Sequence, residues 1–61
     1  MDWKGMEGKQ VFIRTKHDKF YNGKISSVDV SPSLIWISLL DKFGDKIILV
    51  HSEIVEIKEE L

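Results

Sequence analysis

The fold is decided by residues 20–29, which read Phe-Tyr-Asn-Gly-Lys-Ile-Ser-Ser-Val-Asp. Aromatic and β-branched residues dominate this stretch, as is typical of β-strands. Gly23 lies inside the run, and a glycine at such a position marks a place where a strand bends or where other backbone crosses closely. We therefore predict a long, curved central strand here.

The two-residue period of a strand holds only for the first part of this stretch. Tyr21, Gly23 and Ile25 share one face, but Val28 falls out of phase. An extra residue at residues 26–27 would return Val28 to the interior, so we predict a β-bulge there. A strand bent in this way lets a small sheet close on itself, because one strand can serve both halves of a barrel.

Shorter strands are predicted on either side of this one. From Lys9 onward apolar and polar residues alternate, which is the signature of a half-buried strand. Turn chemistry at Asp18 joins this strand to the central one as an antiparallel hairpin. One face of this strand carries Val11, Ile13 and Thr15, and the other carries Phe12, Arg14 and Lys16.

The second half of the chain is divided by turn residues. Residues 31–33, Ser-Pro-Ser, end the central strand because proline has no N–H to donate to a ladder. Strands follow at residues 34–40 and 47–50, with Gly44 expected at a positive φ in the turn between them.

A last short strand is predicted after a tight turn. Ser52 is expected to cap a single helical turn with Glu53 in its favourable first turn. Residues 54–57 then resume the strand pattern, and residues 58–61 are expected to be a frayed, solvated end.

These elements predict one all-β domain over residues 1–61, built as a small five-stranded antiparallel barrel. Residues 1–8 are expected to form a turn or a single helical turn that lays Trp3 and Met6 over one mouth of the barrel. A domain of 61 residues buries only about 60% of the surface that its unfolded chain exposes. Its stability is therefore expected to be modest, and with no cysteine for disulfides, oligomerisation is the expected aid.

Residues 34–40 and 47–50 are apolar on both faces, whereas the interior of a small barrel accepts one face of each strand. We therefore expect a homo-oligomer in which the fourth strand of one subunit pairs with the last strand of the next. The candidate interface residues are Trp36, Leu40, Ile48, Val50 and Val55.

Charge is divided unevenly along the chain, although the net charge is only −1. Residues 1–25 carry six basic and three acidic side chains, and residues 26–61 carry three basic and seven acidic ones. This division fits solvated strand faces with an acidic tail, a polyanion-binding edge, or complementary contacts between identical subunits.

The sequence lacks the residue patterns of an enzyme or a metal protein. His17 and His51 have no ligand-type spacing, and Ser26 lacks the Gly-x-Ser-x-Gly elbow of a serine nucleophile. Without cysteine there is no thiolate zinc site. We expect no catalysis, cofactor, metal or small-molecule substrate. No apolar run reaches about 18 residues and no signal-peptide core is present, so we expect a cytoplasmic protein without a membrane partner.

Two classes of binding function stay open. In the first, cations and aromatic rings on the first hairpin hold a single strand of RNA or DNA by phosphate contact and stacking. The alternative is that the rings Phe12, Phe20 and Tyr21 fill the core and the lysines only solubilise the chain. The second class is a structural or adaptor protein that recruits itself or another chain through its strand edges. The candidate cations are Arg14, Lys16, Lys19 and Lys24.

Residues 8–57 resemble the Sm-like family, small barrels that assemble into rings and bind RNA. The residues that carry the resemblance are Gly8, Val11, Ile13, Tyr21, Gly23, Ile25 and Asp29, with the closing Ser52-Glu53-Ile54 and Ile57. Similar short motifs also occur in other small barrels, including the Src-homology 3 kind. The resemblance implies the barrel and the tendency to form rings.

The chain departs from that family at the residues that bind uridine. The positions two and four after Asp29 are Ser31 and Ser33, where the family has an aromatic residue or His and an Asn. Val50-His51 replaces the usual Arg-Gly. Ser31 cannot stack on a base, so we do not expect the uridine pocket. Asp29 is retained, but it also suits a turn that holds backbone amides, and His51 is the one remaining candidate for stacking on a base at its loop.

Overall fold

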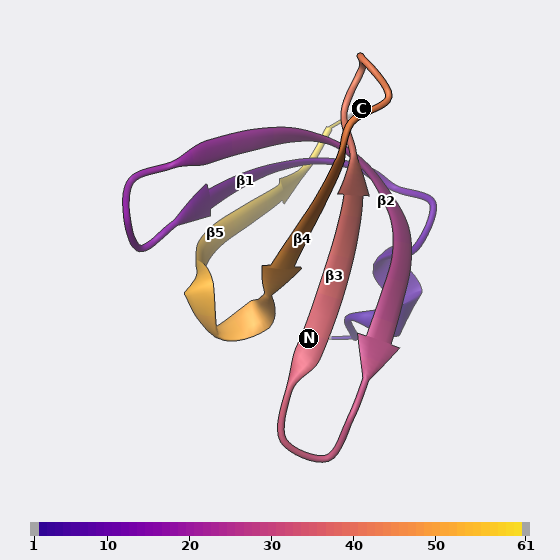
Figure 1. Ribbon diagram of the computed structural model, residues 1–61, viewed down its shortest axis with the longest axis vertical. Coiled ribbons are helices and arrows are strands. Elements are labelled where there is room, and N and C mark those ends of the chain that lie inside the picture. The colour runs from indigo at the N-terminus through magenta and orange to yellow at the C-terminus, as the bar shows by residue number, and fades with distance from the viewer. Residues whose placement is uncertain (1, 61) are drawn as a thin grey trace.

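The structure is a computed structural model that describes residues 2–60 (Figure 1). Four antiparallel pairings join the strands into one five-stranded sheet with the order β4-β3-β2-β1-β5. The predicted all-β class with five antiparallel strands is therefore confirmed. The elements in chain order are η1 (Lys4–Met6), β1 (Gln10–Thr15), β2 (Phe20–Val30), β3 (Ile35–Leu40), β4 (Lys46–Val50), η2 (His51–Glu53) and β5 (Ile54–Glu59).

The predicted central strand is β2, which at 11 residues is longer than the other four. Its pairing with β3 shifts register between Ile25 and Ser27, so the predicted bulge is confirmed. Val28 is 1% exposed, as the phase slip required. Gly23 is buried as well, and a Cβ atom built on it would lie 2.4 Å from the carbonyl oxygen of Leu40. The predicted close backbone approach at Gly23 is therefore confirmed.

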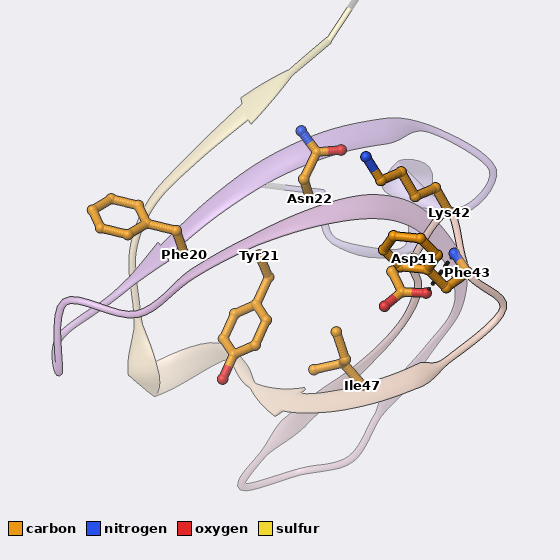
Figure 2. A pocket seen from close by; sticks show the side chains of 7 residues that line it. All are labelled: Phe20, Tyr21, Asn22, Asp41, Lys42, Phe43 and Ile47. Carbon is orange, nitrogen blue, oxygen red and sulfur yellow. Dashed lines mark hydrogen bonds between the residues drawn. The ribbon is translucent and has the colours of Figure 1, made fainter.

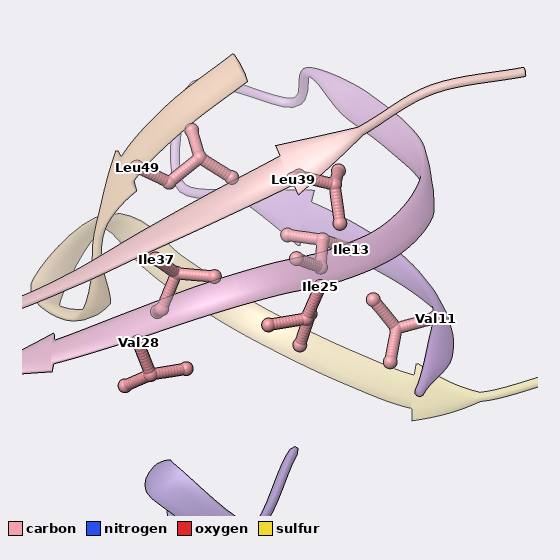
Figure 3. Packing of buried hydrophobic residues seen from close by; sticks show 7 residues of the cluster. All are labelled: Val11, Ile13, Ile25, Val28, Ile37, Leu39 and Leu49. Atoms are coloured by element: carbon pink, nitrogen blue, oxygen red, sulfur yellow. The ribbon is translucent and has the colours of Figure 1, made fainter. Parts of the chain in front are cut away.

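The hydrophobic core lies on the inward face of the curled sheet (Figure 3). Strand alternation explains its composition, since every second side chain of β1 and β3 points inward and the bulge brings β2 back into phase. Thr15 shares the inward face of β1 with Val11 and Ile13 and is 3% exposed. The core residues are Val11, Ile13, Ile25, Val28, Ile37, Leu39 and Leu49.

The two edge strands of the sheet are β4 and β5. Within residues 2–60, β4 pairs only with β3 and β5 pairs only with β1. The sheet is therefore open, and closure into a barrel is not shown. The connection between the two edges is η2, and its Glu53 carbonyl accepts a hydrogen bond of 2.9 Å from the Lys16 N–H.

The tight turns follow their predicted chemistry. Asp18 has a φ of 58° in the β1–β2 turn, and Gly44 has a φ of 85° in the β3–β4 turn. The buried Thr15 hydroxyl organises the first of these turns, because its oxygen accepts the N–H groups of His17 at 3.4 Å and Lys19 at 3.2 Å.

The last part of the chain differs from its prediction in two ways. The tight turn forms at η2, but Ser52 lies inside it and no side chain caps it, because the chain enters the turn through Val50. The end is also less frayed than predicted, since β5 continues through Lys58 and Glu59 and the Glu60 N–H donates to the Gln10 carbonyl at 2.8 Å. Leu61 lies outside the described residues.

The predicted N-terminal helical turn is η1, and Trp3 and Met6 pack against the core. This turn covers the edge of β2 that β1 leaves unpaired beyond Lys24. Glu7 Oε2 accepts the Val28 N–H at 2.7 Å, and Lys4 Nζ donates to the Val28 carbonyl at 2.8 Å. We call this pair of side chains the edge clip.

The edge clip also holds an ion pair of its own, with Lys4 Nζ 3.2 Å from Glu7 Oε2. The hydrogen bond from the Val28 N–H, and next the one from Lys4, lower the pKa of Glu7 from its ordinary value of 4.5. The carboxylate is therefore favoured in the folded protein.

Candidate nucleic-acid interface

The outward face of β1 and β2 carries a pair of stacked aromatic rings. The ring centroids of Phe12 and Phe20 are 5.7 Å apart and the planes are inclined by 29°. Phe20 is 59% exposed, so the stack lies at the surface, whereas Tyr21 faces inward and packs against the core. Of the two alternatives for these rings, the surface position therefore holds for Phe12 and Phe20 and the core position for Tyr21.

Basic side chains lie around this stack, and they differ in whether a carboxylate lies close to them. Arg14 lies directly opposite Phe20 in the ladder, and its guanidinium lies 3.8 Å from Asp18 Oδ1 and 3.7 Å from Glu56 Oε1. Lys16, Lys19 and Lys24 are exposed, and no carboxylate of residues 2–60 lies within 4.0 Å of their ammonium groups. Three lysines are therefore available to an anionic partner, and Arg14 is partly neutralised.

The β1–β2 turn fixes the backbone from which two of these lysines extend. The Thr15 N–H donates to the Lys19 carbonyl at 2.9 Å, and the Lys16 N–H donates to Glu53. The turn is therefore tied both to β1 and to η2. Lys16 and Lys19 extend into solvent from an ordered base.

Asp29 and His51 lie away from this hairpin. Asp29 is inside β2, opposite Trp36 in β3, so the interpretation of it as a turn residue is wrong. His51 begins η2, where its Nδ1 accepts the Ile35 N–H at 3.2 Å and its ring meets Trp3 edge-on with centroids 6.3 Å apart. His51 is thus half-buried and already holds two contacts, which leaves it poorly placed to stack on a base.

The six candidate nucleic-acid residues therefore do not form one surface. Arg14, Lys16 and Lys19 cluster at the first hairpin, Lys24 extends this group along β2, and Asp29 and His51 lie near the far end of that strand. The hairpin group is the part that the structure brings together with exposed aromatic rings.

A second surface is apolar and lies on the outward face of β3 and β4. Cross-strand pairing places Trp36 opposite Val50, and Ser38 opposite Ile48. Trp36 is 41% exposed and Ile48 is 56% exposed. Leu40 continues this patch, which we call the outer apolar face. It therefore contains four of the five candidate interface residues.

The fifth interface candidate, Val55, lies on the other edge strand. It is 53% exposed beside the register shift between Arg14 and Thr15 in the β1–β5 ladder. Ile48 and Val50 thus lie on one edge strand, β4, and Val55 lies on the other, β5.

A hollow of about 420 Å³ lies next to the aromatic stack (Figure 2). It is lined by residues 20–22 of β2, residues 41–43 of the β3–β4 turn, and Ile47 of β4. Sequence reasoning missed this site because it forms only where the curled sheet brings β2 near β4. The one signal for it in the sequence is Phe43, a large aromatic residue inside a predicted turn.

No protein-family model, curated protein or solved structure matches this chain. The resemblance to the Sm-like family stays a prediction. No three His, Asp or Glu side chains of residues 2–60 group closely enough to hold a metal ion. In the same part of the chain, no helix has the length and apolar character needed to cross a membrane.

Proposed function

We propose that this chain is a small binding module with an Sm-like or Src-homology-3-like barrel fold, and that it binds single-stranded RNA or DNA weakly. The observation that carries the proposal is the Phe12–Phe20 stack, exposed at Phe20, beside the ammonium groups of Lys16, Lys19 and Lys24, which no carboxylate of residues 2–60 approaches within 4.0 Å. Rings of this kind stack on bases, and lysines neutralise phosphates without reading sequence.

The charge of the molecule limits the affinity. Arg14 shares its charge with two carboxylates, and the whole chain has a net charge of −1. Lys16, Lys19 and Lys24 give a short electrostatic contact, so binding is expected to weaken strongly as salt is added. Ser31, Ser33 and Val50 offer no base-reading group, so binding is expected to be indifferent to uridine content.

Fluorescence anisotropy with labelled oligonucleotides tests this proposal. Oligo-uridine, mixed-sequence RNA and single-stranded DNA are compared at low and physiological salt. The paired change Lys16→Ala and Lys19→Ala is expected to weaken binding to all three. It is also expected to reduce the slope of log affinity against log salt concentration by the amount that corresponds to about two phosphate contacts. His51→Ala provides the comparison at the other end of β2 and is expected to leave the affinity unchanged.

Either of two results would overturn the proposal as stated. Tight, uridine-selective binding would show that residues 31–33 and Val50-His51 form a base-reading site after all. Equal affinity in the original protein and in the doubly changed one would remove the first hairpin as the contact surface.

A second candidate function is assembly with further copies of the chain. The outer apolar face supports it, because exposed Trp36, Leu40 and Ile48 lie together beside the free edge of β4. Half of the backbone N–H and C=O groups of an edge strand face away from its sheet and can pair with another strand. We propose that β4 of one copy pairs with β5 of the next. This pairing would join the free edge of each sheet to the sheet of the neighbouring copy.

Light scattering over a range of protein concentrations tests the assembly. The original chain is expected to return a mass above that of one copy at high micromolar concentration. Ile48→Lys, which places a charge within the outer apolar face, is expected to shift the measured mass toward that of one copy. Ser33→Lys adds the same charge in the exposed β2–β3 turn and is expected to have no effect. A single-copy mass for the original chain at that concentration would remove this candidate.

A further inference from the structure

We propose that the hollow beside β2 holds one nucleobase of a bound single strand, with the adjoining phosphate on Lys42. This inference rests on the proposed nucleic-acid function and identifies a place where a base leaves the strand and is held. The hollow measures about 420 Å³, within the range of about 300–1,000 Å³ that is usual for small-ligand sites.

The floor of the hollow is apolar and fixed. Tyr21 and Ile47 are half-buried and pack against the core, so their positions are held by the fold. Figure 2 shows Tyr21 and Ile47 extending into the opening between β2 and β4, with Asp41 and Phe43 to the right of it. A flat ring entering here would contact side chains that need not rearrange.

Phe43 supplies an exposed stacking face. Its ring is 78% exposed, which is costly for an apolar side chain and useful for one that receives a ligand. The turn beneath it is ordered, because Asp41 Oδ1 accepts the N–H groups of Phe43 and Asp45, each at 2.9 Å. The Gly44 N–H also donates to the Asp41 carbonyl at 3.0 Å. The ring therefore extends from a turn that hydrogen bonds to Asp41 hold in place.

The charges around the hollow favour an anion that carries a ring. Lys42 Nζ lies 5.3 Å from the Phe43 ring centroid, and no carboxylate of the described residues lies within 4.0 Å of it. The one carboxylate in the lining belongs to Asp41, and one of its oxygens is already engaged by the turn. A nucleotide combines the ring and the negative charge that these groups select.

The hollow is continuous with the proposed strand-binding surface. Phe20 lines it and also stacks on Phe12, so the aromatic stack and the hollow share one side chain. Lys19 immediately precedes Phe20 in the chain, and Lys42 lines the hollow from the β3–β4 turn, so a lysine belongs to or adjoins each of these two lining segments. Successive phosphates could therefore be held by these two lysines.

The test uses amide shifts in two-dimensional NMR spectra of the full chain. Adenosine 5′-monophosphate and uridine 5′-monophosphate are compared with ribose 5-phosphate, which has the same phosphate and no base. Both nucleotides are expected to shift the amides of residues 20–22 and 41–47, and ribose 5-phosphate is expected to shift them much less. Phe43→Ala is expected to weaken nucleotide binding about 10-fold, the usual loss for one stacked base.

Matched variants separate the contributions of charge and ring. Lys42→Ala is expected to weaken nucleotide binding, while Lys46→Ala removes an exposed lysine of the neighbouring strand and is expected to change nothing. Phe43→Leu keeps an apolar side chain without a stacking face and is expected to behave like Phe43→Ala. Because Phe43 and Lys42 are exposed, the dispersed spectrum of each variant serves as the check that it remains folded.

The outcomes distinguish this inference from the function on which it rests. Equal shifts with ribose 5-phosphate would leave only a phosphate contact, and shifts with the peptide Gly-Phe-Gly but not with nucleotides would make the hollow a peptide site; both overturn the inference. An oligonucleotide that binds Phe43→Ala normally but fails with Lys16→Ala and Lys19→Ala would also overturn it while the proposed function stands. If nucleotides bind in the hollow but no oligonucleotide binds the chain, the inference about the hollow stands and the proposed function is overturned.

Discussion

Gly23 shows how a missing side chain sets the distance between two segments. The nearest atoms to a Cβ at this position belong to the backbone of Leu40 and Asp41, which cannot rotate away as a side chain can. Bringing these segments so close is what allows β2 to bend across the end of β3. The prediction of a close approach came from the sequence, because an isolated glycine in an apolar strand has few other uses.

Gly23→Ala is expected to destabilise the protein by about 1–3 kcal/mol, since the added carbon forces backbone apart. Urea unfolding followed by circular dichroism measures the change. Gly5→Ala is the matched control, because the three atoms nearest to its added carbon belong to the exposed side chain of Asp2, which can rotate away, and a change within about 0.5 kcal/mol is expected. Equal stability of the Gly23→Ala protein and the original would contradict the backbone contact.

The hydrogen bonds of Glu7 predict that the stability of the protein depends on pH in the acid range. The pKa of Glu7 in the folded protein is lowered below 4.5, so the carboxylate contributes stability above that pH, and the contribution is lost as the pH falls through the folded value. Glu7→Gln is therefore expected to be less stable than the original at pH 7 and equally stable once Glu7 is protonated. Urea unfolding at pH 7 and in strong acid measures this, with Asp45→Asn as an exposed control.

Among the elements, the β1–β2 turn was predicted well and η2 less well. The turn depends on local chemistry at Asp18, which the sequence displays directly. By contrast, His51 was a candidate for stacking on a base, because nothing in its neighbours along the chain reveals that the Ile35 N–H reaches its Nδ1. That contact exists only because β3 and β4 pair in one particular register. Contacts set by register are the part of a site that local sequence does not contain.

The β1–β2 turn yields a prediction of its own. Thr15→Val removes the buried oxygen that accepts the N–H groups of His17 and Lys19, and is expected to cost about 1 kcal/mol. Amide hydrogen exchange at Lys19 is expected to accelerate. Thr15→Ser keeps the oxygen and should preserve the slow exchange; if both variants exchange alike, the hydroxyl does not organise the turn.

For the molecule as a whole, the alternating pattern and the bulge were enough to predict the strand count, the antiparallel pairing and the buried position of Val28, but they did not say which face of β3 and β4 enters the core. The hollow was not predictable, because Tyr21 and Ile47 come from strands separated in the sheet by β3. Pattern rules say which side a residue faces, but not which residues from distant strands meet. The curvature that brings them together depends on Gly23 and the bulge acting jointly, and its extent is a property of the folded sheet.

The edge clip has one more consequence, for how the molecule could be divided and reassembled. Two side chains of the N-terminal segment occupy the Val28 hydrogen-bonding groups that a neighbouring strand would otherwise take. A chain without residues 2–8 is expected to lose stability and to regain it when those seven residues are added as a separate peptide, measured by thermal unfolding. A peptide carrying Lys4→Ala and Glu7→Ala should rescue poorly. The N-terminal segment would then be a separable peptide that binds in trans, and the uncovered edge of β2 would be its binding site.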